Sequence, residues 1–257
     1  MGRTWEDKRI YGHLVVGCFW TMMSLWWLAK ILQRWRKMGP EGFRISPFYC
    51  AGKSAIPVEP IFKLCIGVFY GYAEYYAGLD PSGNFSATKN AHHMAVCAVL
   101  TMSGLVDLGI RWNVVVPEQL SYIFLMAVGL TDGWLMSVHN DVSFGEGRLG
   151  TDMHQAAGMD PMIGILFLTC EMLHPRSLAI ALLRPIFGLH QAAMFATMSF
   201  VLYQPCCPWD DRHVPIFHAL NLVCYMLTAT LSLTAAVLVH RGSRKLAYKN
   251  WKLPSPY

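Results

Sequence analysis

Charged residues are scarce in this sequence, and their scarcity excludes a soluble fold for most of the chain. They make up 14% of the 257 residues, against 54% for hydrophobic residues, whereas a soluble domain carries about 25% charged residues. The sequence also has no HExxH and no CxxC motif, so the common zinc-site signatures are missing. Its eight cysteines are scattered, and we expect no disulfide framework.

What the sequence does have is a series of long hydrophobic segments bounded by charged residues or by proline and glycine. A transmembrane helix needs about 20 mostly apolar residues to cross the hydrocarbon core. Seven such segments and their short loops use nearly the whole chain. We therefore expect an all-α fold, a single polytopic membrane domain over residues 1–257 that forms a seven-transmembrane-helix bundle, with spans near 10–33, 60–79, 91–110, 115–138, 154–173, 177–203 and 214–240.

The basic residues between these segments predict the orientation in the membrane. The net charge is +5, and Arg36, Arg111, Arg241 and most other basic residues fall on one side when alternate loops are assigned to that side. Because cytoplasmic loops are enriched in Lys and Arg, we expect a cytoplasmic carboxyl terminus and an amino terminus that is outside or lumenal. The positive charge thus reflects topology in the endomembrane system or plasma membrane, and we expect no nucleic-acid partner. The sequon at Asn84 would then face the lumen, where it can be glycosylated.

Histidines gather at one predicted depth, the outer-leaflet half of the bundle. Imidazole groups together with carboxylates are the ligand set for zinc, copper or non-haem iron. Glu74 and Asp132 lie near the same depth and would act as catalytic general base or as carboxylates that orient a ligand. The alternative is that each histidine occupies the membrane interface and bonds to loop carbonyls and headgroups. The predicted metal ligands are His13, His92, His93, His139, His154 and His218.

A second predicted polar cluster lies at the cytoplasmic side and comprises Asp107, Glu171 and His174. Asp107 precedes Arg111 by four residues, so an ion pair within one helix is the simplest expectation for it. If an ion crosses the membrane, the three residues would instead form its inner gate. His190 falls near mid-membrane in the sixth segment.

Two backbone features predict how the helices pack. Pro161 interrupts the fifth segment directly after Asp160, so a neighbouring helix must satisfy the carbonyl that the proline leaves free. Gly67 and Gly71 recur at helical spacing in the second segment. They define a narrow face for close helix packing, either within the chain or between two copies of it.

Several motifs resemble the transmembrane protein 45 family of seven-helix membrane proteins, and the resemblance covers most of the chain from the first to the sixth segment. It implies a seven-helix fold with histidines and acidic residues at family-typical positions, and it implies no particular chemistry. The segment from His139 to His154 is longer than in the family, and His190 has no obvious counterpart there. The resembling motifs are Gly12-His13, Gly17, Leu25-Trp26-Trp27, His92-His93 with Asp107, His154-Gln155 with Glu171, and Gln191 with Phe200-Val201-Leu202-Tyr203.

Four functions are compatible with this pattern. The first is a membrane metalloenzyme acting on a lipid or small molecule, with zinc, copper or non-haem iron as cofactor. The second is a transporter or channel for a metal ion or for protons. The third is a bis-histidine haem site, for example with His93 and His154 as ligands. The fourth is a scaffold or receptor that contacts membrane lipids or forms a homo-oligomer.

Overall fold

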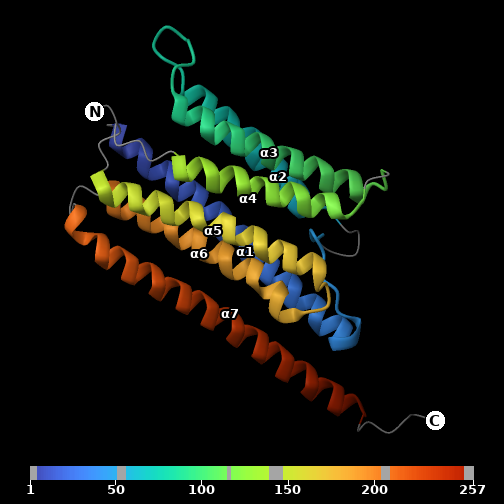
Figure 1. Ribbon diagram of the computed structural model, residues 1–257. Coiled ribbons are helices and arrows are strands. Elements are labelled where there is room, and N and C mark those ends of the chain that lie inside the picture. Colours follow the sequence, from blue (N-terminus) through green and yellow to red (C-terminus); the bar gives the residue numbers. More distant parts are fainter. Residues whose placement is uncertain (1–4, 51–55, 115–116, 139–146, 204–208, 252–257) are drawn as a thin grey trace.

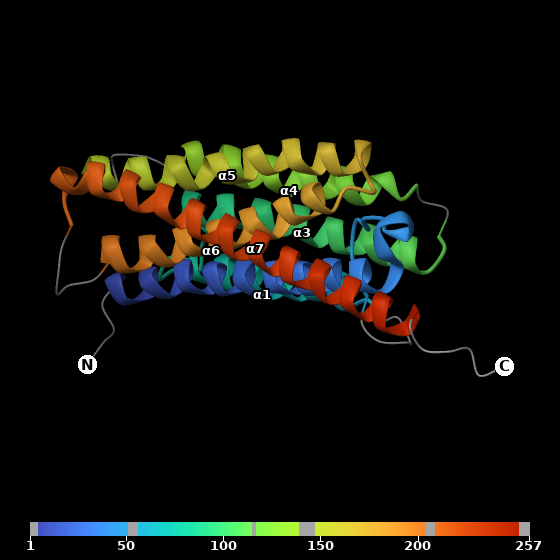
Figure 2. The ribbon, with the colours of Figure 1, turned by 90° about the horizontal axis from the view of Figure 1, so that it is seen from below.

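A computed structural model describes residues 5–50, 56–114, 117–138, 147–203 and 209–251. Within these ranges the chain is helical and contains no β-strand, so the all-α prediction is confirmed for the described part. The helices run along a common direction, and α1 begins at the end of the bundle opposite to the one where α7 ends (Figures 1 and 2). The elements are α1 (Trp5–Gly42), α2 (Val58–Ala77), α3 (Thr88–Arg111), α4 (Gln119–Val138), α5 (Gly147–Leu173), α6 (Leu178–Tyr203), a 3-10 helix (Asp211–His213) and α7 (Val214–Trp251).

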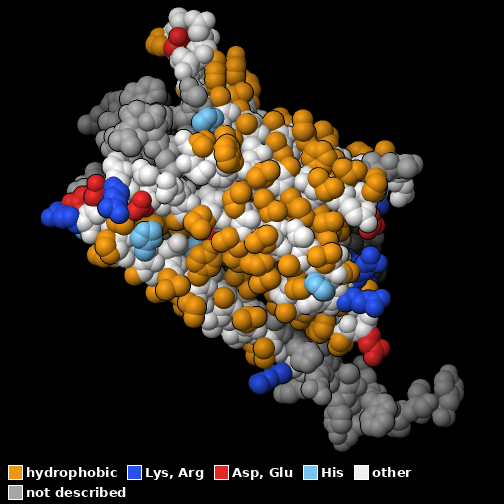
Figure 3. All heavy atoms as spheres, in the orientation of Figure 1, with side chains coloured by type: hydrophobic (Ala, Val, Ile, Leu, Met, Phe, Trp, Pro, Cys, Tyr) orange, Lys and Arg blue, Asp and Glu red, His pale blue; other side chains and the backbone are white. Residues whose placement is uncertain are grey.

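Six of these helices are long and apolar enough to cross a membrane, which indicates a multi-pass membrane protein. On the face shown in Figure 3, hydrophobic side chains cover the middle, and charged side chains gather towards the two ends. The helix that does not meet this criterion is α2, which contains Glu59, Lys63, Glu74 and several tyrosines. The six apolar stretches are Tyr11–Gly42, Asn90–Arg111, Gln119–Val138, Gly147–Leu173, Leu178–Leu202 and Asp211–Thr234.

The two larger apolar cores of the bundle lie one towards each end. We call the end where α1 begins the N-terminal end, and the other the opposite end. Near the opposite end α1 buries a row of residues spaced four apart, one face of a helix, against α6: Met23, Trp27 and Ile31 against Ala181, Leu182 and Ile186. Near the N-terminal end a second core joins α5, α6 and α7 through Met153, Ala157, Met194, Met198 and Phe217. The polar centre of the bundle lies between these cores.

The glycine face of α2 packs inside the chain. A Cβ atom added at Gly67 would lie 2.8 Å from the carbonyl oxygen of Cys97, and one at Gly71 would lie 3.1 Å from the Cys97 Cβ. The distance at Gly67 is shorter than real Cβ atoms show, and the distance at Gly71 is tighter than most Cβ contacts. The absence of side chains at these positions therefore allows α2 and α3 to approach closely. Of the two packing partners that the sequence left open, the structure therefore shows a helix of the same chain.

Among the helix starts, that of α5 differs most from the prediction. The helix begins at Gly147, seven residues before the expected start at 154. Its first turn is held by a side chain far away in the sequence, because the Leu149 amide donates to Asp211 Oδ1 at 2.9 Å. Such a long-range cap satisfies one of the free N–H groups at a helix start. As a result, Asp160 lies in the middle of α5.

Candidate functional site

A buried acid and a buried imidazole face each other at the centre of the bundle. Asp160 and His190 lie near the midpoints of α5 and α6, and His190 has no exposed surface. The His190 Nδ1 atom is 2.5 Å from Asp160 Oδ2. From α7, the Tyr225 hydroxyl donates to Asp160 Oδ1, and Asn221 Oδ1 lies 2.7 Å from His190 Nε2. We call these four residues the central cluster.

The central cluster can satisfy two protonation states of His190 without any change in the backbone of its helices. With Asp160 and Asn221 both presenting oxygens, both ring nitrogens carry protons and the ring is a cation next to a carboxylate. If the Asn221 amide turns by half a rotation, its N–H group donates to Nε2 and the ring is neutral. The Tyr225 ring stacks on the imidazole with the two planes 13° apart, which holds the ring in place in both states.

Pro161 and Gln191 complete the centre of the bundle. Pro161 has no N–H group, so the carbonyl of Ala157 one turn earlier lacks its helical donor. The Gln191 Nε2 atom donates to that carbonyl at 3.1 Å, as the sequence required of a neighbouring helix. The other amide atom, Gln191 Oε1, has no hydrogen-bond partner among the described residues, although the side chain is buried. An acceptor of this kind is normally satisfied by a partner such as water.

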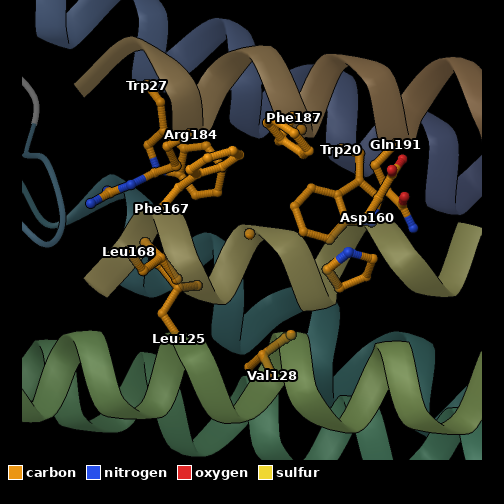
Figure 4. Close-up of a pocket in the computed structure, with 14 residues that line it drawn as sticks. Trp20, Trp27, Leu125, Val128, Asp160, Phe167, Leu168, Arg184, Phe187 and Gln191 are labelled. Atoms are coloured by element: carbon orange, nitrogen blue, oxygen red, sulfur yellow. The ribbon is translucent and has the colours of Figure 1, made fainter. Parts of the chain in front are cut away.

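A cavity of about 70 Å³ begins beside the central cluster. Asp160 and Gln191 lie at one end of it and Arg184 lies at the other, with aromatic rings between them (Figure 4). This volume exceeds the roughly 10–15 Å³ that a single water molecule needs. The remaining lining residues are Trp20, Trp27, Leu125, Val128, Gly129, Pro161, Gly164, Phe167, Leu168, Phe187 and Gly188.

The ion pair of Arg184 closes the cavity towards the opposite end of the bundle. Arg184 on α6 donates through Nε to Glu171 Oε1 at 3.2 Å and through a terminal nitrogen to Glu171 Oε2. Its other terminal nitrogen donates to the Pro47 carbonyl at 3.1 Å, in the segment after α1. In that segment burial raises the pKa of the Tyr49 phenol. His174, directly after α5, is exposed.

Asp107 belongs to a different ion pair. Its Oδ2 atom is 2.7 Å from Lys63 Nζ, and its Oδ1 atom accepts from the Ser121 hydroxyl at 2.5 Å. Lys63 also lies 3.5 Å from Glu59. The expected pair with Arg111 is thus corrected to a pair between helices, because the close packing of α2 on α3 brings a buried lysine to Asp107. Asp107, Glu171 and His174 consequently have three separate environments.

Glu74 and His93 meet near the N-terminal end, between α2 and α3. The His93 Nδ1 atom is 3.1 Å from Glu74 Oε2, and the Asn90 amide donates to the same oxygen at 2.6 Å. Asp132 on α4 interacts electrostatically with His93. This group brings together both carboxylates and one of the histidines that the sequence assigned to a metal centre.

The other histidines lie in different places. His13 and His154 face each other from α1 and α5 with ring centroids 5.8 Å apart, and His154 Nδ1 donates to the Gly150 carbonyl. His218 lies 3.8 Å from Asp152, His92 is partly buried on α3, and His139 lies outside the described residues. No group of three or more His, Cys, Asp or Glu side chains that could hold a metal ion occurs in the described ranges. The His93 and His154 pair weighed for haem is divided between two groups.

Two loop carboxylates mark the N-terminal end. Asp80 accepts from the Ser82 hydroxyl and from the backbone N–H groups of Ser82 and Asn84. The hydrogen bond from the Ser82 hydroxyl is the main reason that the pKa of Asp80 is lowered. The guanidinium of Arg212 lowers the pKa of Asp210 to about 2 by hydrogen bonding. Asn84 lies exposed in the Asp80 turn.

No model of a known protein family matches this chain, and no curated protein matches it either.

Proposed function

We propose that this chain translocates protons across a membrane and that Asp160 and His190 form its proton-binding pair. The observation that carries the proposal is the position of these two groups, fully buried and in contact at the middle of two apolar helices. Ionisable side chains at such depth are costly and typically belong to ion or proton pathways. The central cluster also fits a histidine that changes its charge, because Asn221 can serve either state.

The proposal includes seven crossings, with the N-terminal end outside or lumenal and the carboxyl terminus cytoplasmic. Crossing by α2 is supported by its charged residues Glu59 and Lys63, which are buried against other helices and therefore do not meet lipid. The basic loops support the orientation. An impermeant thiol reagent tests this orientation. Ser82→Cys in the exposed Asp80 turn should react from outside or from the lumen, and labelling from the cytoplasmic side would contradict the orientation.

Membership in the transmembrane protein 45 family and a location in the endomembrane system or plasma membrane are also part of the proposal.

Proton movement is tested in sealed lipid vesicles that contain the purified protein and a pH-sensitive dye. With an imposed pH gradient and a potassium-clamped membrane potential, the wild type should change the internal pH. Asp160→Asn and His190→Gln should reduce the rate to that of empty vesicles, because each leaves one partner without its acid–base counterpart. Asp152→Asn is the matched control, since it makes the same change two turns earlier on α5. Wild-type vesicles that hold the gradient as well as empty ones would overturn the proposal.

A metal centre near the N-terminal end is the second candidate, and the contact between Glu74 and His93 favours it. A carboxylate on an imidazole nitrogen orients the ring and makes the other nitrogen a better ligand, and Asp132 is close by. Such a centre would hold zinc, copper or non-haem iron and act on a lipid or small molecule. Elemental analysis should then find about one metal ion per chain, lost in His93→Ala but kept in His174→Ala. Metal content far below one per chain in the wild type would reject it.

A further inference from the structure

The cavity next to the central cluster leads away from it in one direction. It starts at Asp160 and Gln191 and ends at Arg184, which lies two helical turns before Gln191 on α6. Arg184 in turn contacts the carbonyls of Ser46 and Pro47, which follow the end of α1. The cavity and the Arg184 contacts thus lie between the centre of the bundle and its opposite end.

Polar groups occur at the two ends of the cavity, and its middle is apolar. The unpartnered Gln191 Oε1, together with Asp160, offers acceptors at the central end. Between them and Arg184 the walls are aromatic rings and aliphatic side chains, among them Trp20 and Phe187 (Figure 4). Water in such a space has hydrogen-bond partners at the two ends and few in between. Hydrophobic constrictions in channels have the same arrangement, and they conduct only while they contain water.

We infer that the cavity binds a short file of water molecules that conducts protons between Asp160 and the Arg184–Glu171 pair. The inference rests on the proposed function and adds its route towards the opposite end. For outward-to-inward movement, the protonated His190 ring releases its Nδ1 proton to Asp160 Oδ2, and the new O–H bond of Asp160 breaks as the first water gains a proton. That water releases a different proton to the next one, and the carboxylate of Glu171, which is bound to the cavity-lining Arg184, accepts the last. Arg184 then remains bound to the two loop carbonyls, and no electron is transferred.

Gly164 allows the route to be closed without disturbing the central cluster. It lines the cavity, and a Cβ atom built on it meets no other atom within 4 Å. A larger side chain at this position therefore extends into the open space instead of clashing with backbone. Gly12 on α1 is equally open but does not line the cavity, so Gly12→Leu is the matched control.

The experiment measures proton movement into vesicles for the wild type, Gly164→Leu, Gly164→Val and Gly12→Leu. We expect Gly164→Leu to slow it by about tenfold or more, because the apolar side chain displaces the water. Gly164→Val should have a smaller effect and serves alone if the leucine variant does not fold. Gly12→Leu should match the wild type. The histidine NMR signal of residue 190 should be unchanged in the Gly164 variants, which shows that the proton-binding pair is intact.

Three outcomes separate the inference from the proposed function. Wild-type rates in folded Gly164 variants would overturn the cavity route and leave proton movement standing. Loss of proton movement together with an altered His190 signal would also overturn it, since the effect would then act through the central cluster. Failure of the wild type itself to move protons would overturn the proposed function and the route with it.

Discussion

The bundle contains two kinds of buried ion pair, and they differ in whether the cation can readily lose its proton. In the pairs Lys63–Asp107 and Arg184–Glu171 the cation is a lysine or an arginine, held by several fixed partners. In the central cluster the basic partner is a histidine, the side chain that gains and loses a proton near neutral pH. The permanent pairs therefore fasten helices to each other, and the central pair is suited to exchange a proton.

The two kinds of ion pair also differ in the helices that they join. The permanent pairs connect α2 with α3 and α5 with α6. The central pair connects α5 with α6 as well, and Asn221 and Tyr225 attach α7 to it. Of the six apolar spans, that of α6 is the most buried, at 61%, and that of α7 is the least buried, at 11%. A change in the hydrogen bonds of the central cluster therefore also affects the least buried span.

Breaking a permanent pair should have the largest effect on stability. Arg184→Met leaves Glu171 buried without a partner, and removing one member of a buried ion pair costs about 3–5 kcal/mol. Unfolding monitored by circular dichroism during titration with a denaturing detergent should show this loss. The double variant Arg184→Met, Glu171→Leu should recover most of it, because no unpaired charge remains. Equal destabilisation in the single and double variants would show that packing, and not the charge, is responsible.

Changing the central pair should affect stability less than function. In His190→Gln an amide replaces the imidazole and can still donate to Asp160, so we expect a loss of about 1–3 kcal/mol while proton movement stops. The same detergent titration measures the loss of stability, and the vesicle assay measures the rate of proton movement. A loss as large as that of Arg184→Met, with proton movement retained, would remove the distinction between the two kinds of ion pair.

Tyr225→Phe should have a smaller effect on both properties. It removes one hydrogen bond to Asp160 and keeps the ring that stacks on His190, so the expected loss is about 0.5–1.5 kcal/mol. Proton movement should persist at a reduced rate, because the acid and the imidazole are both present. Tyr76→Phe, an exposed tyrosine on α2, is the control and should match the wild type. Complete loss of proton movement in Tyr225→Phe would place the hydroxyl in the pathway itself.

The smallest effect is expected far from both pairs, in the turn at Asp80. Its lowered pKa means that the folded turn is favoured above the ordinary aspartate pKa of about 3.9, and that this contribution is lost as the pH falls through the lowered value. The amide NMR signals of Ser82 and Asn84 should therefore stay constant at neutral pH and shift only in acid. In Asp80→Asn the acid shift should disappear. If both signals move equally in that variant, another group controls the turn.

Hydrophobic patterning predicts the helices of this chain, and it does not predict which of their polar residues meet. Each expected span overlaps one observed helix because long apolar runs with polar ends leave few alternatives. Six histidines at one predicted depth did not imply one site, since His93 lies with α2 and α3, and His154 lies with α1 and α5. The depth of a residue in the membrane does not determine which helices pack next to it. Lys63 and Asp107, 44 residues apart, form a pair that only the packing of α2 on α3 creates.

The central cluster was missed for a more specific reason. With the fifth span expected from residue 154, Asp160 falls near one end of its helix and His190 near the middle of another. The bond from Leu149 to Asp211 extends α5 backwards and moves Asp160 to the depth of His190. Asn221 and Tyr225 carry no charge, so nothing in the sequence of their apolar segment indicates that they belong to a site. A rule that pairs acids and histidines at equal depth would have found the site, given the correct start of α5.

The most direct measurement is the protonation of His190 itself. Nitrogen-15 NMR of histidine-labelled protein, compared with His190→Gln to identify the signal, reports the proton on each ring nitrogen. If the central pair binds protons, this one signal should pass from imidazolium to neutral imidazole when the pH is raised and should change again in Asp160→Asn. A His190 ring that keeps one protonation state at every pH at which the protein stays folded would contradict a proton-binding role for the pair.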